Sequence, residues 1–201
     1  MNISHKTLEL ARMSLKRFFD TKKYKFSGGP SRFQYVVYSV KEYHNKDLAS
    51  AKAYIEDAFD RRNFNKNKIE KYLSYISTYD NSYRNHLGEA ILISDSISYP
   101  MLNNKVILTG KIGRIDLARN NYEIWLFEED PRTNWKKELR LPLIQNYYAA
   151  KFNAPLNEMS VGIYFFSTGE YESVCFENNE VNKSIIEAKK LYANLLKYPK
   201  T

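Results

Sequence analysis

Residues 89–148 read EAILISDSISYPMLNNKVILTGKIGRIDLARNNYEIWLFEEDPRTNWKKELRLPLIQNYY, and this stretch predicts strands followed by a helix. Three runs have the alternation and β-forming composition of strands: Ala90–Ile97, Lys105–Leu117 and Tyr122–Phe127. Asn120-Asn121 predicts a tight turn between the last two, because asparagine tolerates positive φ. Trp135–Phe152 then places apolar residues at helical spacing. We therefore expect a three-stranded meander with a helix that packs back on it.

Helices are predicted around this core wherever apolar residues recur at helical spacing: Ser4–Asp20, Asp47–Arg61, Lys66–Thr78 and Val181–Leu196. A further hairpin is predicted from Ser160–Ser167 and Tyr171–Phe176, across Thr168-Gly169. Phe33–Val40 is β-branched and aromatic, so both a strand and a helix stay open there. Aromatic residues line one face of the third predicted helix, a pattern more typical of a core than of a base-stacking platform: Tyr72, Tyr75 and Tyr79, with Ile76.

The length of 201 residues and the 43% hydrophobic content predict one domain over residues 1–201. No apolar run reaches the roughly 18–20 residues that cross a bilayer, and the amphipathic N-terminus lacks a continuous apolar segment. The lone Cys175 excludes a disulfide within the chain, and we interpret it as a buried, inert thiol. These features favour an intracellular, cytoplasmic protein without a membrane partner.

The basic charge is concentrated in the first part of the chain. The net charge of +8 falls entirely on residues 1–86, whereas residues 87–201 carry equal numbers of acidic and basic side chains. A basic, mainly helical lobe of this kind indicates a polyanionic partner such as nucleic acid. An ordinary solvated lysine surface is the alternative that the composition leaves open.

Several motifs resemble the RecB-like branch of the PD-(D/E)XK nuclease superfamily. The opening ISHKTLELARMSLKRFF (3–19) is similar to that family's entry signature, and Glu89 stands where the family has a strand-leading glutamate. LTGKIGRIDL (108–117) resembles the family's Leu-x-Gly-x-Ile-Asp-Arg-Ile-Asp-Leu strand, and YEIWLFEED (122–130) resembles the strand that normally reads Ile-Ile-Asp-Tyr-Lys-Thr. IQNYYAAKFNAP (144–155) resembles the helix that carries a Gln and a Tyr.

The resemblance implies an α/β (α+β) fold with a restriction-endonuclease-like core, in which helices flank a central mixed sheet. The N-terminal helical lobe would span residues 1–86 and the nuclease-like core residues 87–201. In such nucleases two strand carboxylates hold Mg²⁺, while a neighbouring lysine positions the attacking water. A histidine from the helical lobe often completes the metal site in this branch.

The motif positions of this chain do not carry those catalytic residues. The first carboxylate position falls on Gly113, while Asp116 matches the second, non-catalytic acid of the pattern. The second carboxylate position falls on Leu126, and the lysine position on Glu128. Ser50–Phe59, the segment expected to donate the histidine, offers Tyr54 or Ile55 instead. The other histidines do not suggest a zinc site either, because His5, His44 and His86 are scattered and we expect them on the surface.

The sequence therefore favours a catalytically degenerate nuclease-fold protein that binds nucleic acid, DNA rather than RNA, or a nuclease or helicase partner. It would need no cofactor. Phosphate contacts are expected from basic residues of the lobe and of the vacated cleft: Lys16, Arg17, Lys22, Lys23, Lys25, Arg32, Lys111, Arg114, Lys136, Lys137 and Arg140. Candidate stacking residues are Phe33, Tyr35 and Tyr54.

Two further hypotheses stay open. The chain is an active Mg²⁺-dependent deoxyribonuclease if a rearranged site assembles from Glu89, Asp116, Glu128, Asp130 and Lys136. It is a protein–protein interaction or inhibitor module if it binds no nucleic acid even at low salt. The fold alone does not choose among these functions.

Overall fold

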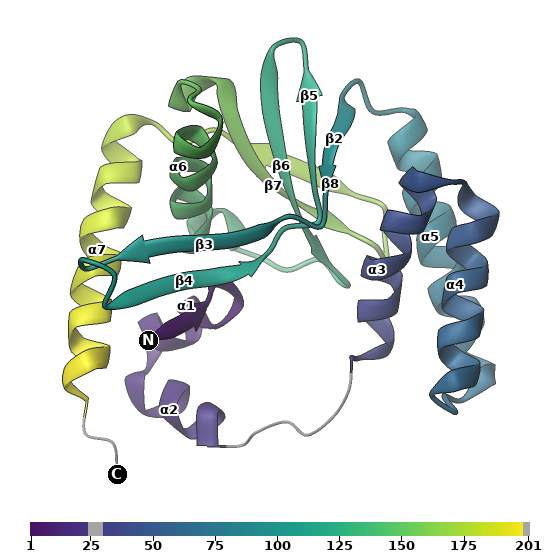
Figure 1. Cartoon of the computed structure of the whole chain (residues 1–201), viewed down its shortest axis with the longest axis horizontal. Coiled ribbons are helices and arrows are strands. Elements are labelled where there is room, and N and C mark those ends of the chain that lie inside the picture. The colour runs from purple at the N-terminus through teal and green to yellow at the C-terminus, as the bar shows by residue number, and fades with distance from the viewer. Residues whose placement is uncertain (24–29, 199–201) are drawn as a thin grey trace.

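The computed structural model describes residues 1–23 and 30–198, with the side chains of Lys22 and Lys23 outside that description (Figure 1). Its α-helices are α1 (His5–Met13), α2 (Leu15–Lys23), α3 (Arg32–Asn45), α4 (Leu48–Arg61), α5 (Ile69–Arg84), α6 (Arg140–Phe152) and α7 (Asn178–Lys197). Its strands are β1 (Asn2–Ser4), β2 (Glu89–Ile93), β3 (Ser96–Met101), β4 (Val106–Lys111), β5 (Arg114–Ala118), β6 (Asn121–Glu128), β7 (Met159–Phe165) and β8 (Tyr171–Val174). Short 3₁₀ helices are η1 (Lys66–Lys68), η2 (Trp135–Lys137) and η3 (Leu156–Glu158).

One long bent hairpin joins the two sheets of the fold. Its antiparallel pairing runs from Glu89 opposite Leu117 to Met101 opposite Val106, but each arm breaks into two strands at the same level. The outer halves, β3 and β4, form a three-stranded sheet with β1 in the order β1-β4-β3. The inner halves, β2 and β5, belong to a five-stranded mixed sheet in the order β2-β5-β6-β7-β8. The predictions of single strands over Ala90–Ile97 and Lys105–Leu117 were therefore wrong at this bend.

Helices cover both faces of the five-stranded sheet, as Figure 1 shows. On one face Ile115, Ile124 and Leu126 pack against Ile144 and Tyr148 of α6. On the other face Trp125, Phe127, Tyr164 and Phe166 pack against apolar residues of α3, α4 and α5, among them Val36, Ile55 and Tyr79. The aromatic stripe of α5 belongs to this second core, which confirms its interpretation as core. A third core lies between the smaller sheet, α1, α2, α6 and α7.

Serine side chains decide where the N-terminal helices begin. The single helix expected over Ser4–Asp20 is interrupted at Ser14, whose backbone is extended and whose hydroxyl accepts a hydrogen bond from the Arg17 N–H. Ser31 begins α3 with a capping box, since its hydroxyl accepts from the Gln34 N–H while the Gln34 side chain accepts from the Ser31 N–H. The cap settles Phe33–Val40 as a helix, despite its β-forming composition.

Other boundaries shift by a few residues. The positive φ angles of the β5–β6 turn fall at Arg119 and Asn120, one residue earlier than expected, and Asn121 already opens β6. Cys175 is exposed, so its interpretation as a buried thiol was wrong. Within the described ranges, no helix is long and apolar enough to cross a lipid bilayer.

The capping box of α3 gives a direct test of this helix. We expect Ser31→Ala to lower the free energy of unfolding by about 1 kcal/mol, because it leaves an N-terminal N–H of α3 without its side-chain acceptor. Ser184→Ala, in the interior of α7, is the matched control and should leave stability unchanged or slightly higher. Urea unfolding of the three proteins measures both effects, and an equal response of the two variants would contradict this role of Ser31.

Candidate functional site

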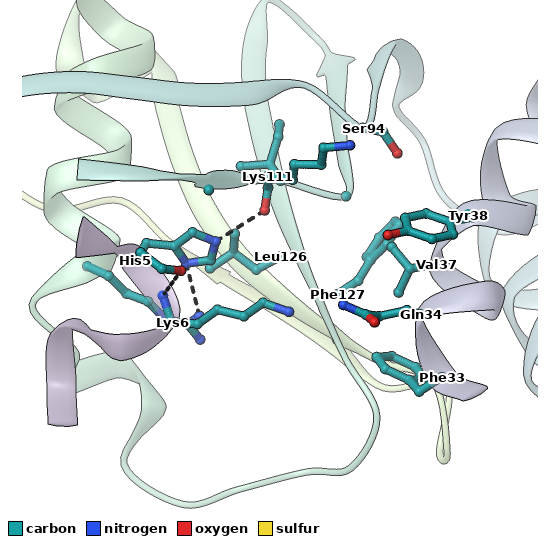
Figure 2. Close-up of a pocket in the computed structure, with 15 residues that line it drawn as sticks. His5, Lys6, Phe33, Gln34, Val37, Tyr38, Ser94, Lys111, Leu126 and Phe127 are labelled. Carbon is teal, nitrogen blue, oxygen red and sulfur yellow. Dashed lines mark hydrogen bonds between the residues drawn. The ribbon is translucent and has the colours of Figure 1, made fainter. Parts of the chain in front are cut away.

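A cavity of about 230 Å³ lies where the long hairpin bends (Figure 2). Gly110, Lys111 and Gly113 line it from the bend, and Leu126 lines it from β6. The Gly113 N–H donates to the Trp125 carbonyl at 2.8 Å, so the pairing between β5 and β6 continues into the bend and brings Gly113 beside β6. The two positions expected to carry the nuclease carboxylates therefore share one cavity. No carboxylate occurs among the described residues that line it.

An aromatic ring occupies the space beside Gly113. A Cβ atom added to this glycine would lie 2.4 Å from two atoms of the Phe127 ring, which is far inside van der Waals contact. Phe127 is 6% exposed and belongs to the core beneath the helical lobe. Because the ring is held by that core, any side chain at position 113 would have to displace it. The local packing thus fits the glycine of this chain and excludes a carboxylate there.

A histidine ring fills the space beside Gly110 in the same way. A Cβ at Gly110 would lie 1.9 Å from Cδ2 of His5, and the φ of +156° also favours glycine. The His5 Nε2–H donates to the Lys111 carbonyl at 3.2 Å, and Nδ1 accepts from the Arg140 guanidinium at 3.2 Å. These contacts attach the first turn of α1 to the bend and to the start of α6.

Two arginines and two glutamates form an ion-pair network next to this cavity. Arg132 and Arg140 both contact Glu128 and Glu138, with Arg140 Nε 2.7 Å from Glu138 Oε2 and Arg132 Nη2 2.7 Å from Glu128 Oε1. Burial acts to raise the pKa of Glu128, but Arg132 and Arg140 together hold it below its usual value. The network lines a neighbouring cavity of about 340 Å³, which also contains Lys6. Glu128, at the expected lysine position, is therefore neutralised by protein cations.

None of the histidines is exposed, contrary to the expectation of surface positions: His5 is buried, and His44 and His86 are half-buried. His5 is 1% exposed, and burial, followed by Arg140, lowers its pKa to about 3. His44 Nε2 lies 2.8 Å from the hydroxyl of Tyr79, which itself accepts from Arg114. Burial, followed by Arg114, lowers the pKa of His44 to about 4.

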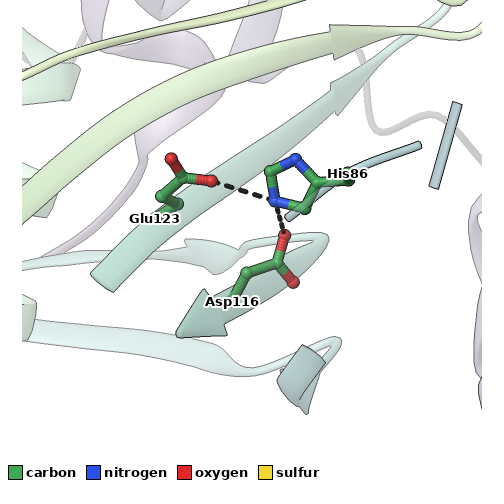
Figure 3. Close-up of side chains that lie close together, drawn as sticks. All are labelled: His86, Asp116 and Glu123. Atoms are coloured by element: carbon green, nitrogen blue, oxygen red, sulfur yellow. Dashed lines mark ion pairs between the residues drawn. The ribbon is translucent and has the colours of Figure 1, made fainter. Parts of the chain in front are cut away.

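The third histidine, His86, lies between two carboxylates at the β5–β6 hairpin (Figure 3). Its Nε2 is 3.0 Å from Asp116 Oδ2 and 3.0 Å from Glu123 Oε2. The Asp116 carboxylate, followed by that of Glu123, raises the pKa of His86 to about 9. Asp116 is also bound by the buried Arg114, whose Nη2 lies 2.7 Å from Oδ2. Neither Asp116 nor Arg114 lines the cavity at the bend.

The expected phosphate-binding residues occupy different parts of the surface. Lys111 and Arg140 line the cavity, whereas Arg114 is 4% exposed and is paired with Asp116, which corrects its expected place in the cleft. Lys136 pairs with Glu172, and neither it nor the exposed Lys137 lines the cavity. Lys16 and Arg17 are exposed on α2. Arg32 is the first residue of α3, and its guanidinium lies over the ring of Phe64. Lys25 and the side chains of Lys22 and Lys23 lie outside the described residues.

The residues of the rearranged nuclease site have separate partners. Asp116 contacts Arg114 and His86, Glu128 contacts Arg132 and Arg140, and Lys136 contacts Glu172. Glu89 is exposed at the start of β2, opposite Leu117, and Asp130 is exposed after β6. In the parts of the chain that the structure covers, the group of His, Cys, Asp and Glu side chains spaced for a metal ion is His86, Asp116 and Glu123. Of the carboxylates expected in the rearranged nuclease site, Asp116 belongs to this group, whereas Glu89, Glu128 and Asp130 do not.

The sequence did not assign several of the cavity-lining residues to a site, among them His5, Lys6, Gln34 and Tyr38. Gln34 and Tyr38 are one helical turn apart on α3, and Figure 2 shows them across the cavity from His5 and Lys6. The capping-box pattern Ser31-x-x-Gln34 could have predicted this helix and thus the shared face. The helix expected to face the site was α4, but Ile55 of α4 is in the core and Tyr54 does not line the cavity.

Comparison with known proteins supports the fold. No protein-family model and no curated protein matches this sequence. Among solved structures, a similar one is that of a "Putative exonuclease" from Eubacterium rectale, with a TM-score of 0.60 and 8% sequence identity over 97% of this chain and 80% of the other. Similarity at this identity concerns the fold alone. The chain therefore has a nuclease-like fold, and the predicted architecture of mixed sheets flanked by helices is confirmed.

The contact between Gly113 and Phe127 can be tested by a double-mutant cycle. We expect Gly113→Ala to destabilise the protein by about 1–3 kcal/mol, since the new methyl group overpacks against the ring. In a Phe127→Leu background the same substitution should cost less, because the smaller side chain can yield. Urea unfolding of the four proteins measures the coupling, and additive costs would contradict the proposed contact.

The low pKa values of His5 and His44 make stability depend on pH. Both groups have folded pKa values below the unfolded value of about 6.5, so the unfolded chain binds more protons between about pH 4 and 6.5. Their contribution to stability is thus present above pH 6.5 and decreases as the pH falls, by up to about 1.4 kcal/mol per pH unit for each histidine. NMR of the ring nitrogens at pH 5 should show both imidazoles neutral, whereas titration midpoints near 6.5 would contradict the assignment.

Proposed function

We propose that this chain is a nuclease-fold protein without catalytic activity that binds the backbone of nucleic acid, preferably DNA, across the cavity at the hairpin bend. The observation that carries this proposal is the composition of that cavity. Glycine and leucine stand at the two positions where the family resemblance implies carboxylates, and lysines project from two sides. Such a site has the cations to hold a phosphodiester and lacks, among its described lining residues, the carboxylates that nuclease chemistry uses.

Two lysines are the proposed phosphate contacts. Lys6 extends from α1 toward α3, and Lys111 ends β4 at the upper rim of the cavity in Figure 2. Desolvation in this confined region lowers the pKa of Lys6 below its usual value, Glu128 raises it, and the charge of Arg140 lowers it again. A bound phosphate would supply an opposite charge to this ammonium group. Arg140 is already paired with Glu128 and Glu138, so it contributes mainly by holding the wall in place.

The size and the lining of the cavity favour a nucleic-acid strand that passes over it. Its volume of about 230 Å³ is below the roughly 300–1,000 Å³ of pockets that enclose drug-sized ligands. Tyr38, Gln34 and Ser94 add hydroxyl and amide groups, which suit sugar and phosphate oxygens. These contacts carry no base information, so the expected binding is independent of sequence and sensitive to salt. The preference for DNA rests on the family resemblance.

The test compares DNA binding of the wild-type chain with that of cavity variants. We expect Lys6→Ala and Lys111→Ala each to weaken binding to labelled single- or double-stranded DNA, measured by fluorescence anisotropy at several salt concentrations. Each lost contact should also reduce the slope of log K against log salt by about 1. Lys183→Ala, an exposed lysine of α7, is the matched control and should retain the wild-type affinity and slope.

Three outcomes would contradict the proposal, and a cleavage assay in Mg²⁺ and Mn²⁺ identifies the first of them. Metal-dependent cutting of the DNA would show an enzyme with a rearranged site. Absence of binding at low salt would instead favour a surface for a nuclease, a helicase or another protein partner. Equal losses in all three lysine variants would locate binding outside the cavity.

A further inference from the structure

Two acidic side chains, those of Asp116 and Glu123, face each other across the β5–β6 hairpin. Neither of them lines the cavity at the bend. Asp116 is the register partner of Glu123, and Asp116 is 0% exposed. Like charges directly opposite on paired strands destabilise a sheet unless a cation lies between them. His86 enters from the connection between α5 and β2 and places its ring against both carboxylates (Figure 3).

Two of the three atoms that converge there lack a hydrogen-bond partner, and the third, Asp116 Oδ2, accepts from Arg114. The side chain of His86 is 8% exposed, and its Nε2 points into the space between the two carboxylates, 3.0 Å from each. Neither contact has the angles of a hydrogen bond, so within the described part of the chain His86 Nε2 and Glu123 Oε2 are buried without a partner. Asp116 Oδ1 is likewise buried and unpartnered there. Buried polar atoms are normally satisfied, so this group requires an explanation.

The spacing of the three groups suits a metal ion. Their ligand atoms all lie within 4.8 Å of one another. Zinc bound tetrahedrally at about 2.0–2.2 Å would separate its ligand atoms by about 3.3–3.6 Å. The present separations of 3.0 Å from His86 Nε2 therefore need to widen by only a few tenths of an ångström. One imidazole nitrogen and two carboxylate oxygens favour zinc-like divalent ions over Mg²⁺, which prefers oxygen ligands alone.

Neighbouring side chains hold the ligands in place. Arg114 donates from Nε to Asp116 Oδ2 at 2.9 Å and from Nη1 to the Tyr79 hydroxyl at 2.6 Å, so the carboxylate cannot rotate freely. The rings of Trp125 and Tyr171 meet the His86 ring edge to face, with centroids 5.9 and 5.6 Å away. Partners of this kind orient the ligands of metal sites and restrict access of water.

We propose that His86, Asp116 and Glu123 bind one zinc-like divalent metal ion, which ties the α5–β2 connection to the β5–β6 hairpin. Solvent would complete the coordination, since three protein ligands leave a fourth position of the tetrahedron open. The site is independent of the proposed nucleic-acid surface, because the two share no residue. Its effect would be structural: the ion replaces the proton on His86 as the cation between the two carboxylates.

The test is a Zn²⁺ titration of the metal-free full chain by isothermal calorimetry, with Co²⁺ as a spectroscopic probe. We expect one equivalent to bind, the thermal midpoint to rise, and bound Co²⁺ to show the visible absorption of four-coordinate nitrogen and oxygen ligation. Glu123→Gln should weaken Zn²⁺ binding at least about tenfold. This variant is chosen because Glu123 is partly exposed, so its neutral isostere should fold. Glu56→Gln, an exposed acid on α4, is the control and should bind like the wild type.

His86→Gln provides a second, independent variant and should lose the Co²⁺ absorption. Failure of the wild-type chain to bind Zn²⁺ or Co²⁺ would overturn the proposal and leave a protonated His86 as the cation of the cluster. Binding that is equal in the wild type, Glu123→Gln and His86→Gln would also overturn it, since the ion would then be held elsewhere.

Discussion

The close packing at the bend of the long hairpin is the constraint on which the rest of the structure depends. Two rings, His5 against Gly110 and Phe127 against Gly113, fill the space that side chains would take at these positions. These contacts allow the two arms of the hairpin to change direction at the same level, so that each arm contributes one strand to each sheet. Because His5 opens α1, the same contact brings the N-terminal segment to the smaller sheet, where β1 pairs with β4.

Ion pairs within the protein determine the charge of the wall beside the cavity. In a metal-dependent nuclease, a divalent ion balances the carboxylates that meet at such a site. Here Arg132 and Arg140 balance Glu128 and Glu138 within the protein, so the acids beside the cavity have cationic partners already. A buried ion pair contributes little net stability, but losing one partner is costly, because an uncompensated charge remains. The network therefore fixes the charges of this wall, whereas Lys6 and Lys111 extend from the neighbouring elements.

The sequence predicted most elements of this fold but not the points where they change direction. Strand alternation and helical spacing depend on local burial, so β6, β7, α4 and α7 lie within a few residues of their expected ranges. The bend at Gly113 depends on Phe127, which is distant in the chain, and no local pattern carries that contact. The same limit applies to His86, Asp116 and Glu123, which spacing alone did not connect. Only the β5–β6 register brings two of them together, and the connection between α5 and β2 supplies the third.

A series of buried and partly buried polar contacts fixes the orientation of the helical lobe on the sheet. It runs from Asp116 and Arg114 of β5 to Tyr79 of α5 and on to His44 of α3. Apolar packing between the same elements is not directional and would tolerate sliding, whereas each hydrogen bond restricts distance and angle. Desolvated polar groups are costly when they are unpaired. The helical lobe therefore has one favoured position on the sheet, in which all of these hydrogen bonds form. That position places one face of α3 against the hairpin bend, and the cavity therefore depends on buried charges that do not line it.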